Sequence, residues 1–150
     1  MFDRILIATD GSEYSEKAAK VGIELAKLSA GKVIIVYVAD IGSYAPSADL
    51  IPAFGGVSPD VIDGIVASIR EAGERATAKV DELARASGVT SERMIVEGNP
   101  PSEILRIAES DKIDLIVMGK IGKTGLEKFL IGSVAEKVVN KSKVPVLIVR

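Results

Sequence analysis

The sequence predicts an α/β fold: a single domain, residues 1–150, built on a doubly wound, Rossmann-like five-stranded parallel sheet with helices on both faces. Short aliphatic runs alternate along the chain with longer segments of helical period, and such alternation implies right-handed crossovers between parallel strands. Four of the five aliphatic runs are nearly continuous rather than alternately polar and apolar. That pattern is typical of strands covered on both faces.

Five apolar runs mark the predicted strands. They cover residues 5–9, 33–39, 94–96, 115–118 and 144–149. The run at 94–96 is the weakest, so we expect it at an edge of the sheet. In folds of this class ligands bind at the carboxyl ends of the strands, which directs attention to Thr9, Asp10 and the residues that follow Met118.

The first two predicted helices follow the first two strands. One covers Glu13–Ser29, with Ser12 as its N-cap and Gly31 as its stop signal. The other opens at Ser58-Pro59 and ends before Gly88. The residues expected to face the core are Ala18, Val21, Leu25 and Leu28 in the first helix, and Ile62, Ile65, Val66, Ile69, Gly73, Ala76, Val80 and Leu83 in the second.

Two shorter helices complete the pattern. The third starts at Asn99-Pro100-Pro101 and the fourth at Gly132-Ser133. Their expected core residues are Ile104, Leu105 and Ala108 in the third, and Val134, Val138 and Val139 in the fourth. The connection 40–57 is longer than usual and is predicted to be a lid, an interface arm or a disordered segment.

Composition excludes several classes of function. The chain contains no histidine and no cysteine, which rules out thiolate or imidazole zinc sites, disulfides and every Ser-His or Cys-His dyad. A net charge of −2 gives no general attraction to nucleic acid or to an anionic membrane. No apolar run approaches the roughly 20 residues that span a bilayer, and the N-terminus leads directly into a strand. We therefore expect a cytoplasmic protein.

The segment after the fourth strand combines glycines with lysines. Gly119, Gly122 and Gly125 follow a buried strand, and a helix start at Gly132-Ser133 comes next. Residues 119–143 hold six lysines and two glutamates, a local charge of +4. Glycines let backbone N–H groups approach phosphate oxygens, and a helix start adds further donors. The segment is predicted to bind phosphate, with a tight turn and helix cap as the alternative.

Two familiar nucleotide motifs are absent. Gly122-Lys123-Thr124 resembles the end of a P-loop, but Val117 stands where that motif needs its first glycine. The first turn begins Asp10-Gly11-Ser12 and lacks the dinucleotide fingerprint. Asp10 itself is a candidate acceptor for a ribose hydroxyl or a ligand for a cation beside phosphates. Its alternative role is a local cap for the turn that follows it.

The glycine spacing resembles a known signature. Gly119, Gly122 and Gly132-Ser133, with two and nine residues between the glycines, are similar to the nucleotide-binding pattern of the universal stress protein family. The resemblance extends over the whole chain, from residues 8–12 to residues 145–149. It implies the strand order 3-2-1-4-5.

The resemblance also implies a ligand, ATP or else AMP or ADP, and its contacts. Asp10 would lie at the ribose and the Val38 backbone at the adenine, whereas Ser133 would bind phosphate through its hydroxyl. The full set of implied contacts is Ala8, Thr9, Asp10, Val38, Met118, Gly119, Lys120, Gly122, Gly132, Ser133 and Val134. A magnesium ion could bridge the phosphates, with no protein ligand assigned. Family members often have proline where this chain has Ala8, and histidine or arginine where it has Ile121.

Three functions remain open, and none has an assigned catalytic residue. The first is a nucleotide-responsive regulatory dimer of the stress response. The second is a slow ATPase or nucleotidyl-transfer enzyme, and the third is a non-catalytic dimeric scaffold. In the expected strand order the run from Val144 to Val149 is an apolar edge. We predict that it pairs antiparallel with a second copy to form a homodimer.

Overall fold

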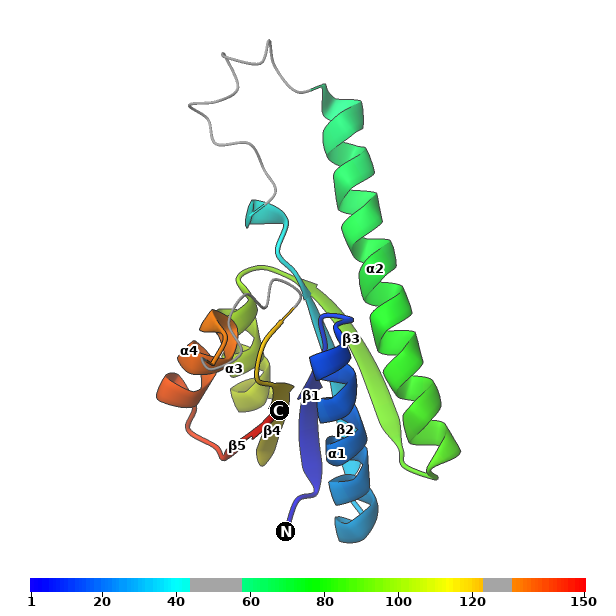
Figure 1. Ribbon diagram of the computed structural model, residues 1–150, viewed down its shortest axis with the longest axis vertical. Helices are drawn as coiled ribbons and strands as arrows, with labels where there is room; N and C mark the ends of the chain where they lie inside the picture. Colours follow the sequence, from blue (N-terminus) through cyan, green and yellow to red (C-terminus); the bar gives the residue numbers. More distant parts are fainter. Residues whose placement is uncertain (44–57, 123–130) are drawn as a thin grey trace.

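The computed structural model describes residues 1–43, 58–122 and 131–150, which form a three-layer α/β arrangement (Figure 1). The predicted fold class is confirmed, because five parallel strands form one sheet in the order β3-β2-β1-β4-β5. From residue 44 onward the predicted long connection lies outside the described residues. The elements are β1 (Arg4–Ala8), α1 (Glu13–Ser29), β2 (Lys32–Ala39), a 3₁₀ turn (Ile41–Ser43), α2 (Pro59–Ala86), β3 (Ser91–Glu97), α3 (Pro100–Ser110), β4 (Leu115–Gly119), α4 (Ser133–Lys141) and β5 (Val146–Val149).

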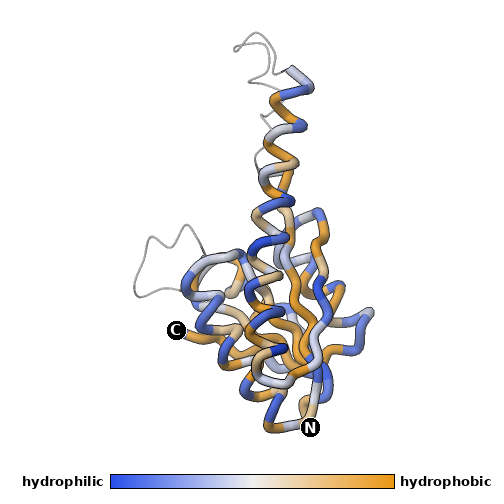
Figure 2. The backbone as a smooth tube through the Cα atoms, turned by 90° about the vertical axis from the view of Figure 1, so that its right-hand side faces the viewer, coloured by the Kyte–Doolittle hydropathy of each residue, from blue (hydrophilic) through white to orange (hydrophobic). Residues whose placement is uncertain are grey.

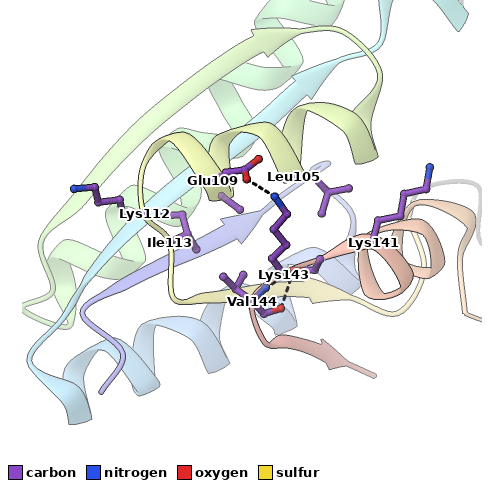
Figure 3. A pocket seen from close by; sticks show the side chains of 9 residues that line it. Leu105, Glu109, Lys112, Ile113, Lys141, Lys143 and Val144 are labelled. Carbon is purple, nitrogen blue, oxygen red and sulfur yellow. Dashed lines mark hydrogen bonds and ion pairs between the residues drawn. The ribbon is translucent and has the colours of Figure 1, made fainter.

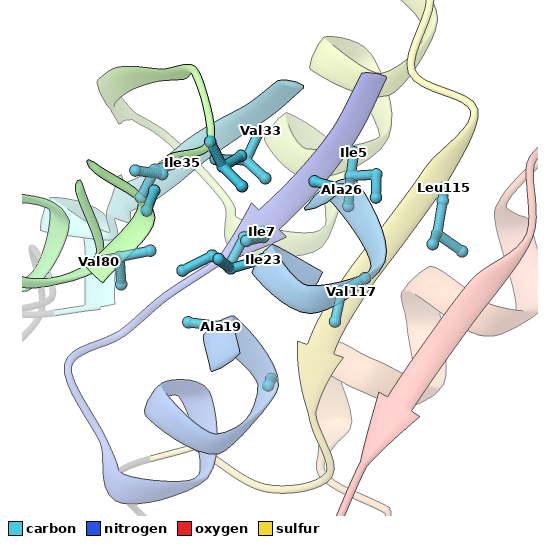
Figure 4. Packing of buried hydrophobic residues seen from close by; sticks show 13 residues of the cluster. Ile5, Ile7, Ala19, Ile23, Ala26, Val33, Ile35, Val80, Leu115 and Val117 are labelled. Atoms are coloured by element: carbon cyan, nitrogen blue, oxygen red, sulfur yellow. The ribbon is translucent and has the colours of Figure 1, made fainter. Parts of the chain in front are cut away.

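Alternate residues of each central strand supply two separate apolar cores. Ile5 and Ile7 face α1 and α2, whereas Leu6 between them faces α3 and α4. All three side chains are fully buried, which explains why the run is continuously apolar. Figure 4 shows α1 lying over Ile5 and Ile7. Burial of each such side chain stabilises the fold by about 1.5–3 kcal/mol.

The predicted helix starts are confirmed, and three of the helices are capped by their own side chains. Ser12, Ser58 and Asn99 each accept a hydrogen bond from the backbone N–H group three residues later. The N-cap of α4 is Gly132, which has no side chain and makes no such bond. The first amides of α4 therefore differ from those of the other helices described.

The buried stripe of α1 agrees with the prediction at Ala18 and Leu25 but differs from it elsewhere. Leu28 is 83% exposed, and small side chains dominate the face against the sheet. The reason is close packing, because a Cβ placed on Gly22 would lie 2.9 Å from the Ile7 side chain. At Gly22, where the helix approaches the sheet most closely, there is no room for a larger side chain, whereas Ile23 beside it is buried in the core. The buried residues of α1 are Ser15, Ala18, Ala19, Gly22, Ile23 and Ala26.

The prediction for α2 is confirmed in its carboxyl-terminal half, whereas in its amino-terminal half Ile65, Val66 and Ile69 are only half-buried and belong to neither core cluster. With 28 residues, α2 is about 42 Å long, whereas the eight residues of β2 span only about 26 Å. Gly73, Ala76 and Val80 are buried as expected, but Ile62 is 42% exposed. The helix therefore extends beyond the sheet (Figures 1 and 2). Val139 of α4, also expected in the core, is exposed as well.

The two edges of the sheet have different chemistry. The weak run around Met94 is confirmed as an edge strand, and β3 carries exposed charged residues at Glu92, Arg93 and Glu97. The opposite edge, β5, is shorter than predicted and has four half-buried aliphatic residues. Within the described ranges no helix has both the length and the apolar character needed to cross a bilayer.

Candidate functional site at the carboxyl edge of the sheet

The turn between β1 and α1 is held in place by hydroxyl and carboxylate groups. The Thr9 backbone N–H donates to the Val36 carbonyl at 2.9 Å, and the buried Thr9 Oγ1 accepts from the Gly11 N–H at 3.2 Å. Asp10 Oδ1 accepts from the Ser12 N–H at 2.9 Å, so the predicted local cap is present. Gly11 has φ +80°, which glycine adopts without strain.

Ser15 is a residue that the sequence reasoning missed. Its hydroxyl lies 3.2 Å from Thr9 Oγ1 and donates to the Ser12 carbonyl at 2.8 Å. Ser15 is buried, so these contacts fix the Thr9 side chain beneath the turn that carries Asp10. A serine in the first turn of a helix is common, and nothing in the sequence distinguished this one from a solvent-exposed residue.

The end of β4 approaches the same turn. A Cβ on Gly119 would lie 2.9 Å from the backbone of Tyr14, so the first turn of α1 packs directly on this glycine. A Cβ on Gly122 would lie 2.7 Å from Asp10 Oδ2. The second oxygen of the Asp10 carboxylate therefore faces the Gly119–Gly122 turn, far from Asp10 in the sequence.

The start of α4 completes the arrangement. The Gly132 N–H donates to the Lys120 carbonyl at 2.7 Å, and the Lys120 N–H donates to the Val149 carbonyl at 2.8 Å. The first helical bond of α4 runs from the Glu136 N–H to the Gly132 carbonyl. The amides of residues 133–135 precede that bond and so lack an intrahelical acceptor. They lie at the positive end of the helix dipole.

The apolar candidates share one side of the sheet. Ala8, Val38, Met118 and Val134 all belong to, or pack against, the core cluster that faces α3 and α4. Met118 is buried, whereas Ser133 at the start of α4 is exposed. Every candidate residue thus lies at or near the carboxyl ends of β1, β2 and β4 or in the first turn of α4.

The lysine clustering is less concentrated than the sequence suggested. Among the described lysines of 119–143, only Lys120 lies within the glycine turns. Lys141 ends α4, about 12 Å along the helix from Ser133, and Lys143 lies beyond it. Lys123 and Lys128 lie outside the described residues. The described residues also bring together no group of three acidic side chains that could hold a metal ion without help from phosphates.

Comparison with known proteins identifies the family. A model of the universal stress protein family matches residues 1–150. The chain belongs to the universal stress protein family. Universal stress protein MJ0531 of Methanocaldococcus jannaschii is 41% identical over 150 residues, covering 100% of this chain and 83% of that protein.

Solved structures of the family share the fold of this universal stress protein. MJ0577, also from Methanocaldococcus jannaschii, has a TM-score of 0.79 at 32% identity, covering 99% of this chain and 96% of the other. A universal stress protein solved in complex with cAMP has a TM-score of 0.68 at 26% identity, covering 99% and 97%. A more distant one from Archaeoglobus fulgidus, in complex with dAMP, has a TM-score of 0.67 at 20% identity, covering 100% and 98%.

Proposed function

We propose that this universal stress protein binds an adenine nucleotide, ATP in the first place, at the carboxyl edge of the sheet. We further propose that residues 1–150 act as one nucleotide-responsive module in a regulatory dimer of the stress response. The observation that carries the proposal is the junction of three segments: Asp10 Oδ2 faces Gly122, and Gly132 lies against Lys120 at the uncapped start of α4. Relatives solved with cAMP and dAMP support the choice of ligand.

The start of α4 suits the phosphates. Amides without an acceptor at the positive end of a helix bind anions. Because Gly132 has no side chain to cap them, phosphate oxygens can take the place that serine or asparagine oxygens take in the other helices described. Ser133, exposed at the same point, adds a hydroxyl donor. Magnesium would supply positive charge to the phosphates here, and no protein residue is assigned to hold it.

The β1 side suits the nucleoside. In the proposed complex, Asp10 accepts a hydrogen bond from a ribose hydroxyl, and Ala8, Val38 and Met118 contact the base from the apolar cluster on the α3 and α4 side. Asp10 Oδ1 is already held by the Ser12 amide, as in a structural acceptor rather than a mobile base. We therefore propose binding with slow turnover at most.

The experiment replaces Gly132 with aspartate. A carboxylate at an N-cap bonds to the first amides of its own helix, so Gly132→Asp would occupy the donors that the phosphates need while α4 remains capped. Its Cβ would lie 3.2 Å from the Lys120 carbonyl oxygen, which requires a shift of only a few tenths of an ångström. Ser58→Asp is the matched control, because it adds the same charge at the N-cap of α2, outside the proposed site.

Nucleotide is measured in two ways: by mass spectrometry of the supernatant after freshly purified protein is denatured, and by calorimetric titration with ATP, ADP and AMP. The unaltered protein and Ser58→Asp are expected to bind ATP, and Gly132→Asp to lose at least about tenfold in affinity with an unchanged melting temperature. Equal ATP affinity in Gly132→Asp and Ser58→Asp would show that the site is misplaced.

A further inference from the structure

A hollow of about 280 Å³ lies at the amino ends of the strands, the opposite end of the sheet from the glycine turns (Figure 3). It is formed between the carboxyl-terminal ends of α3 and α4 and the segments that lead into the amino ends of β4 and β5. The glycine turns follow the carboxyl ends of the parallel strands, whereas the hollow lies at their amino ends. The two sites therefore share no residue. The lining residues are Leu105, Ala108, Glu109, Lys112, Ile113, Lys141, Ser142, Lys143 and Val144.

The floor of the hollow is apolar and preformed. Ala108 and Ile113 are 5% and 3% exposed and belong to the core cluster beneath α3 and α4. Leu105 and Val144 pack against the same cluster and are partly buried. These side chains are held by the core itself, so the floor needs no rearrangement to accept an apolar group.

The rim is cationic. Lys112, Lys141 and Lys143 surround the floor, against one carboxylate, Glu109. Lys143 Nζ lies 2.5 Å from Glu109 Oε1, and this hydrogen-bonded pair lowers the pKa of Glu109 and raises the pKa of Lys143. Among the residues that the structure describes, Lys112 and Lys141 form no ion pair. The lining therefore carries a charge of +2 in a chain whose net charge is −2.

Lys112 occupies an unusual backbone position. Its φ is +52°, in the left-handed region that favours glycine after a helix. The Ile113 N–H returns to the Ala108 carbonyl at 2.9 Å, which completes a helix end of the type that normally ends in glycine. A lysine near the carboxyl end of a helix interacts favourably with the helix dipole. At position 112, however, glycine would adopt the positive φ with less backbone strain. Figure 3 shows Lys112 and Lys141 at opposite ends of the hollow, with the Lys143–Glu109 pair between them.

We propose that this hollow binds a small amphipathic carboxylate. The apolar body lies on Ala108, Ile113 and their neighbours, and the carboxylate is held by the ammonium groups of Lys112 and Lys141, whose flexible side chains turn inward to reach it. A volume of about 280 Å³, just below the range of about 300–1,000 Å³ for ligand pockets, limits the body to on the order of eight carbon atoms. The lining residues are separate from the proposed nucleotide site, so the two proposals stand or fall independently.

Octanoate is the probe, titrated into ¹⁵N-labelled protein while backbone amide shifts are followed. Saturable shifts are expected at residues 105–113 and 141–144, and none at Asp10 or Gly132. Octanol has the same chain without the charge, and acetate has the charge without the chain. Each is expected to bind at least about fivefold more weakly than octanoate. Octanol or acetate binding as tightly as octanoate would overturn the proposal, as would the absence of saturable shifts.

Variants test the lysine rim without endangering the fold. Lys112→Gly removes one ammonium group and places glycine where the backbone favours it, so thermal stability should be kept or raised. Octanoate affinity should fall about fivefold in this variant and in Lys141→Gln. Lys137→Gln, an exposed lysine of α4 that does not line the hollow, is the matched control and should bind normally. Normal octanoate binding in both rim variants would refute the assignment.

Discussion

At the residue scale, the glycines of the carboxyl edge differ in what a side chain would meet. At Gly119 the nearest atoms belong to the backbone of Tyr14, which cannot move without shifting α1. At Gly122 the nearest atom is Asp10 Oδ2, which belongs to a side chain and can give way at the cost of the bond that Oδ1 accepts from the Ser12 N–H. Gly119 therefore serves packing between β4 and α1, whereas Gly122 keeps space open beside Asp10.

This difference predicts opposite outcomes for two alanine substitutions. Gly119→Ala should lower the free energy of unfolding by about 1–3 kcal/mol, because overpacking forces backbone shifts. Gly122→Ala should lower it by no more than about 1 kcal/mol, the contribution of the Asp10–Ser12 hydrogen bond, but should weaken ATP binding, because it displaces the Asp10 carboxylate. Urea denaturation and ATP titration measure the two effects. A Gly122→Ala protein with full ATP affinity would argue against a role for Asp10.

The ion pair between Lys32 and Glu92 joins β2 to β3 and predicts a pH dependence. Lys32 Nζ lies 2.5 Å from Glu92 Oε1, and this hydrogen bond together with the lysine charge lowers the pKa of Glu92 below its ordinary value of 4.5. A carboxyl group with a lowered folded-state pKa stabilises the fold above the unfolded-state pKa and loses that contribution as the pH falls through the folded-state value.

Glu92→Gln should therefore be slightly less stable than the unaltered protein at pH 7 and equally stable once the pH is below the folded-state pKa of Glu92. The difference is small because half of the Glu92 side chain is exposed. Urea unfolding between pH 7 and pH 3 measures it, and Lys32→Gln should give the same profile. A stability gap that widens toward low pH would contradict the assigned sign.

Single-residue roles were the hardest to predict from the sequence. The Gly119, Gly122 and Gly132 spacing located the carboxyl-edge turns, because that pattern is local. The contact of Asp10 with Gly122 and the burial of Ser15 depend on segments far apart in the chain. The lysine count also misled, because Lys141 and Lys143 are close to the glycines in sequence but lie near Glu109, at the amino ends of the strands.

At the element scale, the two halves of α2 differ in how they pack against the sheet. Its carboxyl-terminal half packs on β2 and β3 through Gly73, Ala76 and Val80, and Gly73 lies so close to Tyr37 that a Cβ would be 2.6 Å from the ring. Its amino-terminal half has the same apolar periodicity but extends past the strands. Periodicity shows which face of a helix is apolar, but not how far the surface opposite to it extends.

Two truncations along α2 should separate these halves. Val80 is 1% exposed, so Val80→Ala should cost about 2 kcal/mol of unfolding free energy. Ile62 is 42% exposed, so Ile62→Ala should change stability by less than about 0.5 kcal/mol, helped by the higher helix propensity of alanine. Denaturant unfolding of both variants provides the measurement. A large loss from Ile62→Ala would show that the projecting half is covered in solution.

The strands were predicted more reliably than the helix faces. In β1, Ile5 and Ile7 are buried on one face of the sheet and Leu6 on the other. Because every residue of such a run is apolar, the strand is predicted without knowing which residues face which side. In α1 the prediction is confirmed for Ala18 and wrong for Leu28, because close packing at Gly22 turns a face rich in small residues toward the sheet. Which residues of α1 face the sheet depends on the distance between the helix and the sheet, and the hydropathy pattern does not predict that distance.

At the scale of the whole molecule, the two edge strands of the sheet differ in how well their side chains prevent pairing with another chain. The β3 edge is protected by Glu92, Arg93 and other charged residues. The β5 edge is short, aliphatic and half-buried on both faces. This asymmetry supports the proposed homodimer, in which β5 of one chain pairs antiparallel with β5 of the other about a two-fold axis.

Backbone direction in β5 provides a sharp test. The carbonyls of Pro145 and Val149 accept bonds from the β4 side. Because backbone groups alternate along a strand, the N–H of Ile148 faces outward, away from β4. Ile148→Pro removes that donor without removing a β4 bond, and Ile148→Val keeps it. Sedimentation at micromolar concentration should show a monomer for Ile148→Pro and a dimer for Ile148→Val. A monomeric unaltered protein would refute the dimer.

The projecting half of α2 also has a consequence for how the molecule opens. Among the described residues, little packs on the helix near Asp60, whereas hydrogen bonds near Ala84 break only when the sheet comes apart. Amide hydrogen exchange should therefore slow progressively from one end of α2 to the other. Fast exchange near Asp60 would report fraying of the helix, and slow exchange near Ala84 would report global unfolding. Amide protection along this one helix would thus range from local to global opening.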